Sequence, residues 1–75
     1  MPKLPSIKPK ELIRILNKLG FKEVRQTGSH KQFRKSGNLN IVTVSFHNKD
    51  IKQTTLRSII RQTNLTIEEF INLLK

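Results

Sequence analysis

Cysteine, tryptophan and tyrosine are all absent from this sequence of 75 residues. Without cysteine the chain has no disulfide, no thiolate metal ligand and no cysteine nucleophile, and a cytoplasmic location is compatible with that absence. Without Trp and Tyr, stacking of nucleic-acid bases would depend on the four Phe residues, most of which we expect in the core. No apolar run approaches the length of a membrane span.

Acidic residues are also scarce, because 5 Asp and Glu stand against 15 Lys and Arg, which gives a formal net charge of +10. Catalysis by divalent metals needs clustered carboxylates or histidines, so we predict no metal and no cofactor. A positive field of this size favours nucleic acid or an acidic protein as partner. An anionic membrane is less favoured, because the basic residues are spread over several predicted elements.

The length suits a single small domain that begins with a helix. Apolar residues recur at helical spacing between Pro9, which suits a first helical turn, and Gly20, which suits a stop. We therefore predict a helix over residues 9–19. The residues before it, 1–8, are predicted to be a flexible or extended arm, so the single domain spans 9–75.

Three strands and two further helices are predicted after the first helix. The strands are expected at residues 21–26, 30–35 and 40–47, with turn residues at 36–39. Leu56, Ile59 and Ile60 predict the second helix, capped by Thr54 or Thr55. For the third helix, Thr66 and Glu69 form a capping box and Leu65 is expected to pack on Phe70. This order predicts an α+β fold, in which helices cover one face of a three-stranded antiparallel sheet.

The alternation of side chains along each strand decides which residues reach the open face of this sheet. Phe33 is the large apolar residue of its strand and is expected in the core. The other core residues expected from the strands are Val24, Val42, Val44 and Phe46. The residues expected to point outward are Glu23, Arg25, His30, Gln32, Arg34, Thr43, Ser45 and His47, with Ile41 as an apolar exception. The register, which the sequence does not fix, places His30 opposite Ser45 or near His47.

His30 is the candidate catalytic residue. Histidine changes its charge near neutral pH and transfers protons in catalysis, and a cationic surface binds phosphate. Gly28 lets the backbone approach a ligand, and Ser29 offers a hydroxyl and an N–H group. The other candidate RNA-binding residues are Lys22, Arg25, Lys31, Arg34 and Lys35. We interpret this pattern as RNA cleavage; the alternative is a surface histidine without a role.

His47 is a second histidine on the predicted open face and a possible auxiliary to His30. Two histidines on one face would allow base and acid roles to be divided. We favour the simpler interpretation, in which His47 ends a strand beside a turn.

The chain resembles HicA-type toxins, the YcfA/HicA family of mRNA interferases, over nearly its whole length. The resemblance is carried by Lys10 to Ile13, Leu19 to Phe21, Gly28 to His30, Phe33-Arg34, Thr55 to Gln62, and Leu65 to Phe70. It implies a fold like a double-stranded-RNA-binding domain and a metal-independent endoribonuclease that cuts mRNA and stops growth. It also implies a HicB-like antitoxin, and it maps the family's catalytic histidine onto His30. Members often have a glycine where this chain has Thr54, which we expect to cap the helix.

RNA carries its own nucleophile, the 2′-hydroxyl, so a cleaving protein needs a base for that proton and cations for the developing charge. We therefore expect transesterification to a 2′,3′-cyclic phosphate, with His30 as the base and Lys31 and Arg34 stabilising charge. The general acid is left open among His47, Ser29, a lysine and water. Two other functions also stay open: a non-catalytic RNA-binding module, and a protein-interaction domain with a basic face.

Overall fold

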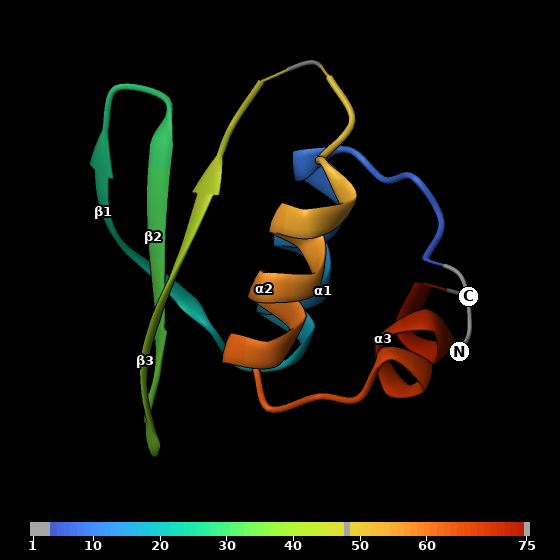
Figure 1. Ribbon diagram of the computed structural model, residues 1–75. Helices are drawn as coiled ribbons and strands as arrows, with labels where there is room; N and C mark the ends of the chain where they lie inside the picture. Colours follow the sequence, from blue (N-terminus) through green and yellow to red (C-terminus); the bar gives the residue numbers. More distant parts are fainter. Residues whose placement is uncertain (1–3, 48, 75) are drawn as a thin grey trace.

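A helix, three strands and two further helices follow one another along the chain (Figure 1). The computed structural model describes residues 4–47 and 49–74. The elements are α1 (Pro9–Lys18), β1 (Lys22–Thr27), β2 (His30–Lys35), β3 (Asn38–Ser45), α2 (Gln53–Gln62) and α3 (Ile67–Leu74). The strands pair antiparallel in the order β1-β2-β3, and the helices lie to one side of the sheet (Figure 1). The predicted α+β fold is confirmed, while the likeness to a double-stranded-RNA-binding domain stays a prediction.

The first helix forms where the sequence predicts it. Pro9 begins α1, and Leu12, Ile15 and Leu16 on one stripe are 0–1% exposed. Gly20 follows the helix with φ +96°, a conformation that glycine adopts without the steric cost of a Cβ.

In the part of the chain that the structure describes, no helix is long and apolar enough to cross a membrane.

The hairpin between β2 and β3 is tighter than predicted. Gly37, at φ +86°, allows a two-residue turn, so that Asn38 already pairs with Lys35. The Asn38 side chain accepts the N–H of Asn40 at 2.9 Å and donates to the carbonyl of Gln62 at 3.3 Å. The strand predicted at residues 40–47 therefore begins two residues earlier, at Asn38. A register shift between Phe33 and Lys35 absorbs these two residues, so that Phe33 pairs with Val42, and the strand ends at Ser45.

A β-bulge at Val24 shifts the alternation of side chains along β1. Glu23 pairs with Phe33 and Arg25 pairs with Gln32, so Val24 has no partner on β2. Glu23 consequently shares the helix side of the sheet with Phe33, whereas Arg25 faces the open side. The prediction was right for Arg25 and wrong for Glu23. It was also wrong for Val24, which is 56% exposed instead of buried.

The core fills the space between the sheet and the helices. Its largest buried side chains are Phe21, Phe33, Phe70, Leu12, Ile15, Leu16, Leu56, Val42 and Val44. Val42 and Val44 are buried as predicted, because α1 and α2 pack against β3. Phe46 was predicted to join them and does not, because β3 ends at Ser45 and the Phe46 ring beyond it is 43% exposed.

The segment before α1 also contributes to the core. Leu4 and Ile7 are each 3% exposed, and the carbonyl of Ile7 accepts the N–H of Ile51 at 2.9 Å. Residues 4–8 belong to no helix or strand, and two of their side chains pack into the core, while the flexibility expected of this arm stays a prediction. Residues 1–3, which belong to the same predicted arm, lie outside the described residues.

The last two helices begin differently. α2 starts at Gln53 after Lys52, without a side-chain cap, so the prediction of a Thr54 or Thr55 cap was wrong. At α3 the capping box is confirmed: Glu69 N–H donates to Thr66 Oγ1 at 3.1 Å, and Thr66 N–H donates to Glu69 Oε1 at 2.9 Å. Hydrogen bonding of the Glu69 carboxylate to Thr66, by the backbone N–H first and by the side chain second, lowers the pKa of Glu69 from its ordinary value of 4.5.

Candidate active site

His30 is the first residue of β2 and is exposed on the open side of the sheet. It pairs with Ser45 on β3 and with Thr27 on β1, so two hydroxyl-bearing residues flank it. Phe33, three residues further on, is 1% exposed and lies on the opposite side. The predicted solvent-facing position of His30 is confirmed, and the register question is resolved in favour of Ser45.

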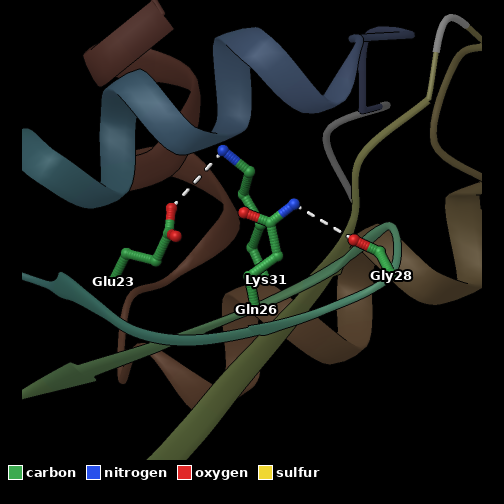
Figure 2. A network of polar contacts seen from close by, with 4 residues as sticks. All are labelled: Glu23, Gln26, Gly28 and Lys31. Carbon is green, nitrogen blue, oxygen red and sulfur yellow. Dashed lines mark hydrogen bonds and ion pairs between the residues drawn. The ribbon is translucent and has the colours of Figure 1, made fainter.

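The turn between β1 and β2 sets the position of His30. Gly28 has φ +59°, and a Cβ built on it meets nothing within 4 Å, so this turn needs glycine for its backbone conformation and leaves open space outside. Gln26 Nε2 donates to the Gly28 carbonyl at 3.0 Å (Figure 2). The Ser29 carbonyl accepts the N–H of Phe46 at 2.6 Å. Hydrogen bonds therefore fix the backbone at Gly28 and Ser29, the two residues that precede His30.

Three of the predicted RNA-binding cations share the open side with His30. Lys22 pairs with Arg34, and Arg25 pairs with Gln32, the residue two positions after His30. The side chains of Lys22, Arg25 and Arg34 are exposed. We call this set, together with His30, the open-face cluster. It places cations along the same strands that carry the histidine, where they can contact successive phosphates of one nucleic-acid strand.

Lys31 and Lys35, also predicted to bind RNA, are not part of this cluster. They alternate with His30 and Arg34 along β2 and lie on the helix side with Phe33. Lys31 Nζ is 3.4 Å from Glu23 Oε1 and 4.7 Å from the centroid of the Phe46 ring. Figure 2 shows the side chains of Lys31 and Glu23 pointing toward one another. Lys35 Nζ is 5.8 Å from the centroid of the Phe21 ring.

His47 lies beyond the end of β3, and its Nδ1 accepts the backbone N–H of Lys49 at 3.2 Å. This contact agrees with the interpretation of His47 as a residue beside a turn. The ring also lines a cavity of about 300 Å³ between β3 and α2, which sequence reasoning did not find. Lys49 and Lys52 line the same cavity. A part for His47 in catalysis stays a prediction.

The strands contribute no carboxylate to the open-face cluster, although Asp50, after β3, lines the same cavity as Ser45. Glu23 is the only acidic residue in the three strands, and the bulge at Val24 turns it to the helix side. Among residues 4–47 and 49–74, no three His, Asp or Glu side chains gather in a group that could hold a metal ion. The chemistry available on this face is therefore that of an imidazole, hydroxyls and cations.

These features define a small basic α+β protein with one exposed histidine on an open sheet face. A sequence model described as "HicA toxin of bacterial toxin-antitoxin" matches residues 9–65, which include all three strands, α1, α2 and His30. The chain belongs to the HicA toxin family of bacterial toxin–antitoxin systems. Membership implies a cognate antitoxin as partner. No curated protein matches the chain.

Proposed function

We propose that this HicA toxin is a metal-independent endoribonuclease that cleaves mRNA in the cytoplasm, with His30 as its general base. The observation that carries the proposal is the exposed imidazole of His30 on the same sheet face as Lys22, Arg25 and Arg34. An imidazole supplies a proton acceptor near neutral pH, and the cations supply affinity for the phosphate backbone. Family membership supports the same activity.

His30 has one bond-making step to assist. It takes the proton of a ribose 2′-hydroxyl, the 2′-oxygen attacks the adjacent phosphorus, and the 5′-oxygen of the next nucleotide leaves with a proton from a general acid. The products are a 2′,3′-cyclic phosphate and a 5′-hydroxyl. A positioned base of this kind contributes about 10²–10⁴-fold to the rate. The general acid is one of His47, Ser29, a lysine or water.

Arg25 and Arg34 are proposed to hold the scissile phosphate and to stabilise the charge that develops on its oxygens. Guanidinium groups suit this role because their fixed N–H donors match two phosphate oxygens at once. The strands place no carboxylate on this face, and this favours phosphate binding because a carboxylate there would repel the phosphate.

The cognate antitoxin is proposed to be HicB-like and to cover the open-face cluster. An acidic surface on the antitoxin would be attracted by the same cations that attract RNA. Occupation of this face would keep RNA from His30, so binding and inhibition would be a single event.

The experiment compares growth of bacteria that express the full chain, its His30→Ala variant or its His47→Ala variant, each without antitoxin. The two variants are matched because each removes one exposed imidazole. We expect growth arrest from the wild type, none from His30→Ala, and a far smaller loss of toxicity from His47→Ala. Equal arrest by wild type and His30→Ala, at equal protein levels, would exclude His30 as the base. Tight RNA binding without cutting would favour the binding-module function instead.

A further inference from the structure

Phe46 is an aromatic side chain that lies outside the core. Phe21, Phe33 and Phe70 are each 1% exposed, whereas Phe46 is 43% exposed. Because the chain has no Trp or Tyr, Phe46 is its one exposed side chain of the Phe, Tyr and Trp class, beside the exposed imidazoles of His30 and His47. The other large apolar side chains that are exposed among the described residues are aliphatic: Val24, Leu39 and Ile41. An exposed aromatic ring on a strongly basic protein is the group on which an unpaired base stacks.

The backbone places Phe46 next to the candidate catalytic residue. Its N–H donates to the carbonyl of Ser29 at 2.6 Å, directly beside the pair formed by His30 and Ser45. Phe46 therefore continues the pairing of β2 and β3 by one residue. Alternation puts its ring on the helix side and the His30 ring on the open side. An RNA strand that crosses this end of the sheet would meet both rings in turn.

Lys31 gives the ring a charged neighbour. Its Nζ lies 4.7 Å from the ring centroid and is held there by Glu23 Oε1 at 3.4 Å. The ammonium thus lies over one face of the ring, while Phe46 as a whole residue stays 43% exposed. The net charge of +10 on the whole chain favours a nucleic acid over an uncharged partner for this ring.

We propose that Phe46 is a base-stacking platform, and that it makes the toxin select single-stranded RNA with an unpaired base beside the cleaved phosphate. The inference deepens the proposed function and rests on it for the position of the cleaved bond. Selection for single strands follows because a base inside a duplex has both of its faces covered by its neighbours, whereas an unpaired base can swing out onto a ring.

The first experiment measures RNA affinity in the full chain carrying His30→Ala, so that the probe is not cut. The probes are a short single-stranded oligoribonucleotide and the same strand in a duplex. Phe46→Leu keeps apolar volume but removes the aromatic face, Phe46→Trp keeps an aromatic face, and Leu39→Ala alters an exposed apolar residue near the opposite end of β2. We expect Phe46→Leu to weaken single-strand binding by about 5- to 150-fold, with Phe46→Trp and Leu39→Ala near the parent. Thermal unfolding of each variant checks that the fold is retained.

A second experiment locates the stacked base. Each nucleotide of the probe is replaced in turn by an abasic one. At one position the loss of the base should weaken binding to the parent protein but not to Phe46→Leu, because the partner ring is already gone. The absence of any such position would overturn the inference. An equal loss from Phe46→Leu and Phe46→Trp, or an equal loss on single strand and duplex, would also overturn it.

The outcomes separate this inference from the proposed function. If the protein with His30 intact cuts RNA and Phe46→Leu cuts and binds as well as wild type, the platform is wrong and the ribonuclease stands. If no RNA is cut but Phe46→Leu shows the expected coupling, the platform stands and the ribonuclease is wrong. Unchanged RNA affinity together with weakened binding of the cognate antitoxin would overturn the inference and make Phe46 part of a protein interface.

Discussion

Alternate residues of β2 have opposite roles. His30, Gln32 and Arg34 point to the open side of the sheet, where His30 and Arg34 are exposed. The residues between them, Lys31, Phe33 and Lys35, point to the helix side: Phe33 is in the core, and the two lysines lie over aromatic rings at its margin. One strand of six residues therefore supplies both the candidate site and part of the core.

This contrast shows that net charge overstates the number of cations that share one face of the sheet. Lys31 is nearer to His30 in sequence than Arg34 is, and Lys35 directly follows Arg34, yet both lysines pack beside Phe46 and Phe21 instead. A lysine can lie along an apolar surface with its long stem and still keep its ammonium near water. Strand alternation and register, and not distance along the chain, decide which cations share the open face with His30.

The largest expected difference between the two sides is in stability. Phe33→Ala should lower the free energy of unfolding by about 3–5 kcal/mol, because it leaves a cavity between the sheet and the helices. His30→Ala removes an exposed side chain and should change it by no more than about 0.5 kcal/mol. Chemical denaturation of both variants measures this. A loss of several kcal/mol from His30→Ala would mean that the imidazole is a packing residue.

The next largest difference concerns cations on the two sides. Arg25→Gln and Arg34→Gln should each reduce the slope of log affinity against log salt concentration for single-stranded RNA by about 0.7, since each removes one phosphate contact. Lys35→Gln, on the helix side, should leave the slope unchanged. The measurement is RNA binding over a salt series. Equal slopes for Arg34→Gln and Lys35→Gln would remove the distinction between the two sides.

The smallest expected effect lies away from both sides, in the α3 cap. Thr66→Ala should lower the free energy of unfolding by about 1 kcal/mol while RNA cleavage by the folded protein stays unchanged. The lowered pKa of Glu69 means that its contribution is present above the ordinary value of 4.5 and is lost as the pH falls through the lowered value. Thr66→Ala keeps the backbone N–H, the larger cause of this lowered pKa, and removes only the side-chain contribution, so the pH dependence of stability should decrease only slightly in this acidic range. Unfolding curves from neutral pH down to acid pH check both effects, and an unchanged free energy of unfolding at neutral pH would contradict the capping account.

Local patterns predicted most of the fold. The stripe of apolar residues in α1 and the capping box at Thr66 each depend on neighbours a few positions away, so they can be recognised in one sequence. The side on which His30 lies followed from Phe33 in the same way. The role of His30 was predicted from its neighbours and from the resemblance to HicA toxins, and it stays a prediction.

What the sequence could not predict depends on contacts between strands. One extra residue at Val24 reverses the side on which Glu23 lies, and no local pattern marks that bulge. The exposure of Phe46 depends on where β3 ends, and no local pattern in the sequence marks that end. The helix-side position of Lys31 and Lys35 could have been predicted. Each lies two residues from Phe33 on the same strand and so shares its face.

The central claim is that His30 removes the proton of a ribose 2′-hydroxyl on the open face of the sheet. The most direct test is to cut a defined single-stranded RNA with the purified protein in the presence of a metal chelator, and to determine the ends of the fragments. The account predicts 2′,3′-cyclic phosphate and 5′-hydroxyl ends, and a rate about 10²–10⁴-fold lower for His30→Ala. Fragments that end in a plain 3′-hydroxyl, or equal rates for the two proteins, would contradict it.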